Sequence, residues 1–241
     1  MDKGVLHTLQ QEILSLQGYK PPPVQAQSSI GLGIIESAFP YKVFPFRVVH
    51  ELSSYSEAEA VATNGFIAAV LGKMLSHSKK CMWIAQEQMV YPPALKSFGI
   101  EPEQVIFVEA RKSKDLLWII EESLKCETLV AVVGATDHLS FTESRRLQLA
   151  VEQSHVTGFI HRVSPRQQET VACAARWHIQ SLPSITEDSL PGVGFPQWNV
   201  ALLKVRNGQT GQWQLQWKSG QFSHLEKQAP ALPAYRQLQT G

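Results

Sequence analysis

The feature that most constrains the fold is an unbroken apolar run from Leu129 to Val133. A strand with one face in water alternates apolar and polar side chains, whereas a strand covered on both faces is apolar throughout. The run therefore predicts a central strand of a sheet that has helices on both sides.

Helices and strands alternate on either side of that run, which is typical of an α/β fold with a mainly parallel sheet. The last helix of the series begins with a capping box, because Ser140 precedes Glu143 by three residues. We expect further strands over 47–52, 82–85, 105–108 and 156–161, and helices over 58–75, 94–98, 115–125 and 142–153.

The pattern changes after about residue 170. A strand is expected over 176–179, and two further strands, 198–206 and 213–217, flank the turn that begins at Asn207-Gly208. A turn of this type between two apolar segments predicts a β-hairpin. Trp213, Leu215 and Trp217 alternate with glutamines, so one face of the hairpin should be buried.

The N-terminal segment has a narrow apolar stripe formed by Leu6, Leu9, Ile13 and Leu16. Its spacing of three and four residues is typical of a docking helix or a coiled coil. The prolines at 21–23 cannot continue that helix. We therefore divide the chain into an N-terminal helix (1–20), a linker (21–45), a core with the hairpin (46–222) and a loose tail (223–241).

Composition excludes some classes of function. The formal net charge is only +1, whereas a protein that holds DNA alone through its phosphates has a basic excess, so we expect DNA contact to be indirect or weak. Cys81, Cys126 and Cys173 form no Cys-x-x-Cys pair and are expected to be reduced thiols. No signal-peptide pattern or membrane-spanning apolar run is present, which predicts a cytoplasmic protein without membrane contact.

The loop after the first strand lacks the residues of a phosphate-binding loop. That loop requires Gly-x-x-x-x-Gly-Lys-[Ser/Thr], in which glycines let backbone amides approach the phosphate. Residues 53–59 contain no glycine and no lysine, and they include two carboxylates, Glu57 and Glu59, that would repel an anion. Gly72-Lys73 lies in the middle of a predicted helix. We predict that no nucleotide or cofactor is bound.

The acids that hydrolysis would require are also incomplete. Gly134 follows the central apolar run, where a nucleotide hydrolase needs an acid to organise magnesium. Asp137 and His138 come later and lack further ligands at metal-site spacing, so no metal site is expected. His50 and Glu51 are adjacent on a strand and should point to opposite faces. Glu87 follows a strand end and is most simply a solvated carboxylate.

A few surface candidates remain. Arg145 and Arg146 lie on the helix flank opposite Leu147 and Ala150, where they either face solvent or contact a partner. Trp118 is expected to pack in the core, whereas Trp213 and Trp217 could equally line a binding surface.

This order of elements, with Glu87 and Tyr91-Pro92-Pro93 at their places, resembles the core of RecA recombinases. A sharper resemblance is to ImuA proteins, RecA-related factors of bacterial damage-induced mutagenesis, and it covers nearly the whole chain. The segments that carry it include 44–51, 83–84, 91–95, 117–122, 131–134, 144–150 (Ser-Arg-Arg-Leu-Gln-Leu-Ala), 156–158, 176–177 and the hairpin around Asn207-Gly208.

The resemblance implies a RecA-like core without its ATP chemistry. Glu87 stands where RecA keeps the glutamate that activates water, but residues 53–60 and Gly134 do not match the phosphate loop and the strand-end acid, and ImuA proteins also lack them. It implies a role in translesion DNA synthesis with an ImuB-type polymerase-like protein and an error-prone replicative-type polymerase. Contacts with RecA or with further copies of the chain are also implied.

We therefore predict a non-enzymatic factor that acts through protein contacts, with no catalytic residue. Two alternatives stay open: a SulA-like cell-division inhibitor that binds FtsZ, and an enzyme with an atypical nucleotide site that uses Glu87. The candidate partner-binding residues are Leu6, Leu9, Ile13, Leu16, Arg145, Arg146, Trp213 and Trp217.

Overall fold

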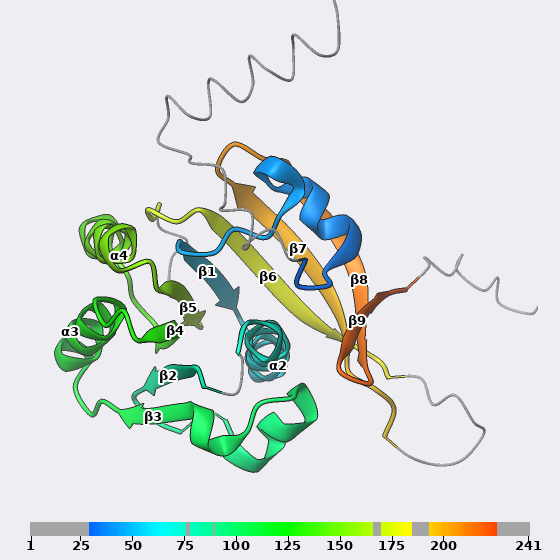
Figure 1. The fold of residues 1–241 in the computed structure, drawn as a ribbon, viewed down its shortest axis with the longest axis horizontal. Coiled ribbons are helices and arrows are strands. Elements are labelled where there is room, and N and C mark those ends of the chain that lie inside the picture. The colour runs from blue at the N-terminus through cyan, green and yellow to red at the C-terminus, as the bar shows by residue number, and fades with distance from the viewer. Residues whose placement is uncertain (1–28, 76–77, 89, 166–169, 185–192, 226–241) are drawn as a thin grey trace, which may run out of the picture.

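Six parallel strands and three antiparallel ones follow each other in one sheet within the part of the chain that the structure describes (Figure 1). The structure is a computed structural model, and it describes residues 29–75, 78–88, 90–165, 170–184 and 193–225. The strand order is β3-β2-β4-β5-β1-β6-β7-β8-β9. The strands are β1 (Val49–Ser54), β2 (Lys80–Ala85), β3 (Val105–Glu109), β4 (Leu129–Thr136), β5 (Thr157–Val163), β6 (Ala175–Leu182), β7 (Gln197–Val205), β8 (Gly211–Lys218) and β9 (Gln221–His224).

Helices cover the two faces of the parallel part. Helix α2 (Glu57–Met74) lies on one face, and α3 (Ser113–Leu124) and α4 (Phe141–Ser154) lie on the other (Figure 1). Strand β4 has a neighbour on each side, β2 and β5, and nearly all of its side chains are buried. The central apolar strand and the α/β fold with a mainly parallel sheet are thereby confirmed, and the architecture is consistent with a RecA-like core.

Helix α2 is apolar nearly all round because the sheet curls around it. Phe66 of α2 contacts the rings of Trp177 on β6, Trp198 on β7 and Phe222 on β9, with centroid distances between 5.8 and 6.0 Å. The short helix η4 (Pro92–Phe98) packs on another side of α2. A helix enclosed in this way carries no polar stripe.

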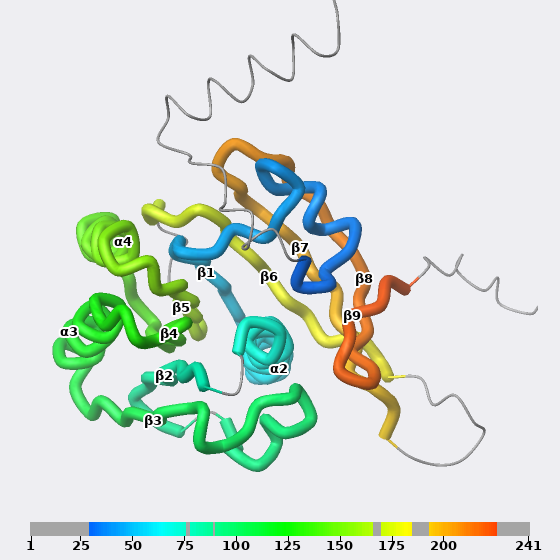
Figure 2. The backbone as a smooth tube through the Cα atoms, in the orientation of Figure 1, coloured from blue at the N-terminus to red at the C-terminus, as the bar shows by residue number. Residues whose placement is uncertain are grey.

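The predicted linker is wrong for its second half. Residues from 30 to 44 pack on the sheet through buried side chains, and they form the short helices η2 (Gly33–Ala38) and η3 (Pro40–Lys42). This segment crosses the sheet at β8 and β9 (Figure 2), and the backbone oxygen of Leu32 lies 2.9 Å from Nε2 of His224. Leu32, Ile35 and Phe39 have helical spacing, but Gly33 and Pro40 limit the segment to a few residues, too short for the period to identify its burial.

Other boundaries also differ from the predictions. Strand β1 begins at Val49 and continues through Ser53 and Ser54, and β4 continues through Gly134 to Thr136. The tail boundary at 223 falls inside β9, whose Phe222 is buried against Trp217. The hairpin of β7 and β8 and the capping box of Ser140 and Glu143 are confirmed. The predicted helix at 1–20 lies outside the described residues.

Candidate functional site

The connection between β1 and α2 is where a RecA-like core would hold a phosphate. Here only Tyr55 and Ser56 separate the strand from the helix. Ser56 caps the helix, its hydroxyl accepting a hydrogen bond from the backbone N–H of Glu59 at 3.3 Å. The carboxylate of Glu59 turns back and accepts from the backbone N–H of Tyr55 at 2.7 Å. Two backbone N–H groups of this turn, those of Tyr55 and Glu59, thus donate to the chain's own side chains.

Glu59 is also held from the sheet. Its Oε1 lies 3.1 Å from Nε2 of His178 and accepts from the side-chain amide of Gln180 at 3.2 Å. Partial burial alone would raise the pKa of Glu59, but hydrogen bonds from Tyr55, His178 and Gln180 lower it below its ordinary value. An ionised carboxylate therefore lies at the N-terminus of α2, the position that the helix dipole makes favourable for an anion.

Gly134 does not end its strand, contrary to the prediction. It lies within β4, two residues before the last one, and a Cβ added there would collide with the side chain of Ile120 on α3. An acidic side chain at 134 would require Ile120 to move. The residue that does follow β4 is Asp137, which is exposed together with His138. Among the described residues, no three His, Cys, Asp or Glu side chains gather as a metal site.

Glu87 lies two residues beyond the end of β2, and its side chain is exposed. No phosphate loop accompanies Glu87 in the described residues, because the capped turn at Ser56 stands in the place of that loop.

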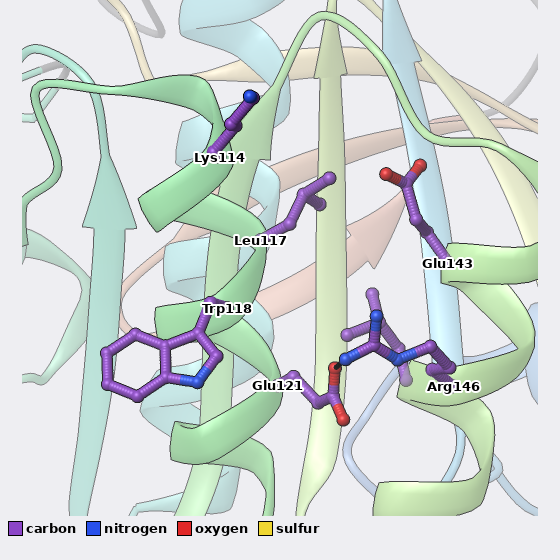
Figure 3. A pocket seen from close by; sticks show the side chains of 7 residues that line it. Lys114, Leu117, Trp118, Glu121, Glu143 and Arg146 are labelled. Atoms are coloured by element: carbon purple, nitrogen blue, oxygen red, sulfur yellow. Dashed lines mark ion pairs between the residues drawn. The ribbon is translucent and has the colours of Figure 1, made fainter.

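A shallow pocket of about 280 Å³ lies between α3 and α4 (Figure 3). Arg146 of α4 reaches across it, and its Nη2 lies 2.5 Å from Oε2 of Glu121 on α3. Lys125 also pairs with Glu121, at 3.2 Å. We call this surface the α3–α4 groove, and its lining consists of Lys114, Leu117, Trp118, Glu121, Glu143, Arg146 and Leu147.

Trp118 is the large apolar side chain of this groove, and it is 61% exposed. The prediction that it packs in the core is wrong. Leu116, Ile120 and Leu124 are the buried positions of α3, and a residue two positions after Leu116 must lie on the opposite side of the helix. Figure 3 shows its ring on the outer side of α3. The helical spacing could therefore have identified it.

The remaining candidates are scattered. Arg145 is exposed on α4 but does not line the α3–α4 groove. Trp213 is half-buried on β8. Trp217 is only 3% exposed, so its assignment as a partner-binding residue is corrected to a core residue. Its indole N–H donates to the backbone oxygen of Ser97 at 2.9 Å, and its ring packs on Phe98 and Phe222.

The apolar stripe of Leu6, Leu9, Ile13 and Leu16 lies outside the described residues, so its docking role stays a prediction. Of the eight candidates, Arg146 lines the α3–α4 groove.

Comparison with known proteins supplies the family. No family model matches the chain. Protein ImuA of Caulobacter vibrioides, in strains NA1000 and CB 15, is 30% identical over 208 residues, which cover 81% of this chain and 84% of the relative. The chain belongs to the ImuA family. Membership in the ImuA family connects it with DNA-damage-induced mutagenesis. No helix in the described part of this ImuA-family chain is both long and apolar enough to cross a membrane.

Proposed function

We propose that this ImuA-family chain is a non-catalytic, RecA-like accessory protein of SOS-induced error-prone translesion DNA synthesis and DNA repair, and that it acts in the cytoplasm through protein contacts. The observation that carries the proposal is the carboxylate of Glu59 at the N-terminus of α2, where the fold would otherwise place a phosphate.

The negative charge and the hydrogen bonds of Glu59 disfavour ATP at the N-terminus of α2. Glu59 accepts hydrogen bonds from the backbone N–H of Tyr55 and the side-chain amide of Gln180 and lies 3.1 Å from Nε2 of His178, so displacing it would leave these donors without their acceptor. A triphosphate at this position would also face a fixed negative charge. A hydrogen bond to a charged group contributes about 1.5–3 kcal/mol, so losing the bonds from Tyr55 and Gln180 weighs against nucleotide binding.

The α3–α4 groove supports the choice of a protein partner. Tryptophan and arginine are the residues that most often dominate the energy of protein interfaces, and Trp118 and Arg146 both line this groove. Phe141 and Leu149 of α4 add exposed apolar surface at 57% and 44% exposure. We assign the groove to an ImuB-type polymerase-like protein. RecA and an error-prone replicative-type polymerase are the further partners proposed.

The binding test uses the full chain and the ImuB-type protein of the same organism. Trp118→Ala is expected to weaken binding by about 30-fold or more, as for a buried aromatic anchor. Leu203→Ala is the matched control because Leu203 is also exposed, at 45%, but lies on β7. Equal affinity of the Trp118 variant and the wild type, measured by titration calorimetry, would show that the groove is not the interface.

A second measurement tests the absence of nucleotide binding. Titration of the chain with ATP and magnesium is expected to give no binding heat at millimolar nucleotide. Micromolar binding that Glu87→Gln retains would overturn the proposal of a nucleotide-free protein. Depolymerisation of FtsZ by the chain would assign it to the cell-division inhibitors instead.

A further inference from the structure

The second groove of the described chain lies on the opposite face of the sheet, beside α2. It has a volume of about 410 Å³ and is mainly apolar. One wall is a row of small residues on α2, the facing wall is formed by η4, and the residues at the start of β7 close the end. We call it the α2 groove, and its lining includes Ala58, Val61, Gly65, Tyr91, Phe98 and Trp198.

Aromatic rings flank the floor of the α2 groove. A Cβ added to Gly65 would lie 3.3 Å from Cζ2 of Trp198 and 3.7 Å from Cζ of Phe98, so the helix backbone at Gly65 packs closely against both rings. Val61 and Tyr91 at the rim are 70% and 72% exposed. Clustered apolar exposure of this kind marks binding surfaces.

Asn64 is one of the polar side chains in this mainly apolar lining, and its amide nitrogen is available as a hydrogen-bond donor. Asn64 is 7% exposed, and its Oδ1 lies 2.9 Å from Nδ1 of His161. Because an amide oxygen only accepts, Nδ1 of His161 donates and its Nε2 accepts the hydroxyl of Ser54 at 2.9 Å. Burial lowers the pKa of His161 to about 4, which keeps the ring neutral in this chain of bonds.

This arrangement fixes the amide nitrogen of Asn64 as a donor. In the part of the chain that the structure describes, Nδ2 has no hydrogen-bond partner. Because Asn64 lines the α2 groove, an acceptor bound there can pair with this donor. The ligand that fits is therefore apolar and extended, and it presents a free carbonyl oxygen.

We propose that the α2 groove binds the proline-rich segment 229–235 of the same chain, Ala-Pro-Ala-Leu-Pro-Ala-Tyr. Pro230 and Pro233 are three residues apart, which is one turn of a polyproline II helix. Such segments dock in aromatic-lined grooves, lose little entropy on binding, and leave their backbone carbonyls unpaired. One of these carbonyls accepts from Nδ2 of Asn64, and the proline rings lie against Tyr91, Phe98 and Trp198.

The segment is within reach. The described chain ends at Leu225, whose backbone N–H donates to Gln214 on β8. In the sheet register His224 stands opposite Leu215, which stands opposite Trp198, so two strand spacings of about 10 Å in total separate β9 from the groove. The four residues 226–229 span up to about 13 Å when extended. Attachment in the same chain also gives the segment an effective concentration in the millimolar range.

Disulfide trapping in the full chain tests the proposal. Leu232→Cys is combined with Val61→Cys in a Cys126→Ser background, which removes the exposed native thiol. Cys81 and Cys173 are buried, and burial raises the pKa of each thiol to about 12, so both react slowly. An intramolecular disulfide is expected to form about tenfold faster than in the control pair of Leu232→Cys with Leu149→Cys on α4, the other face of the sheet.

Two further variants separate docking from chance collision. Asn64→Asp keeps an acceptor for His161 but removes the donor, and it should slow trapping at least about fivefold. Pro230→Ala with Pro233→Ala should slow it similarly and leaves the core untouched, so it serves if the Asn64 variant does not fold. Equal rates for the Val61 and Leu149 pairs would overturn the proposal. Covalent dimers, which indicate a second copy, or faster trapping by Pro22→Cys than by Leu232→Cys, would also overturn it.

Discussion

On the α2 face of the sheet a buried histidine, His50, is neutral, whereas on the α3 and α4 face a buried carboxylate, Glu51, lies in an ion network. Strand β1 contributes to both, since His50 points to the first face and Glu51 to the second, as their adjacency predicted. His50 stacks between Phe44 and Phe159, its Nε2 donates to the backbone oxygen of Pro45, and its Nδ1 accepts the indole N–H of Trp177. Burial lowers its pKa to about 4, against a weaker opposite effect of the Pro45 hydrogen bond.

Glu51 on the other face pairs with two guanidinium groups. Its side chain is 1% exposed, with Arg162 at 3.4 Å and Arg176 at 2.6 Å. Burial first, and then the charge of Glu51, raise the pKa of the neighbouring Cys173 thiol to about 12. The difference teaches that one strand can bury an ionisable group in two ways: the group gives up its charge, or opposite charges surround it.

Removal of Glu51 should have the largest effect on the free energy of unfolding, because this buried carboxylate pairs with two arginines. Glu51→Ala removes the buried carboxylate that pairs with both Arg162 and Arg176 and is expected to destabilise the fold by about 3–5 kcal/mol. Urea unfolding followed by circular dichroism measures this. Glu122→Ala removes a carboxylate that is half exposed and paired with Lys125, and it should cost less than about 1 kcal/mol. Equal costs for the two variants would contradict a special role of burial.

Acid should destabilise the fold through the buried neutral histidines His50 and His161. A histidine with a folded pKa of about 4 and an unfolded value near 6.5 binds its proton more readily when unfolded, so stability is complete above pH 6.5 and falls as the pH drops towards 4. Each of His50 and His161 contributes a loss of about 3 kcal/mol over that window. In His161→Gln the difference in unfolding free energy between pH 7 and pH 4 should shrink by about that amount. An unchanged difference would mean that His161 is not held neutral.

The smallest effect is expected for the exposed ion pair of the α3–α4 groove. Arg146→Ala removes its pair with Glu121, but Arg146 is more than half exposed, so the expected cost is about 0.2–1 kcal/mol and should decrease with added salt. Thermal unfolding at low and high salt provides the measurement. A loss above 2 kcal/mol would place this pair with Glu51 rather than with surface pairs.

Local patterns located most of the parallel core. The apolar run at 129–133, the spacing of Leu116, Ile120 and Leu124, and the capping box of Ser140 and Glu143 each depend on neighbours in the chain, so they could be predicted. The packing of residues 30–44 and the pairing of β9 could not, because their partners are distant in sequence. The absence of a phosphate loop was visible from composition, but the reach of Glu59 to His178 depends on how β6 lies beside β1.

The sequence by itself determined the α/β class, the resemblance to ImuA proteins and the lack of phosphate-loop residues, since these depend on residue type and short spacing. Only the tertiary structure decided that Trp217 is a core residue, that Ile120 closes the space at Gly134, and that two grooves lie on opposite faces of the sheet. The reason is that exposure, charge compensation and groove shape are set by side chains brought together from distant segments when the sheet curls around α2.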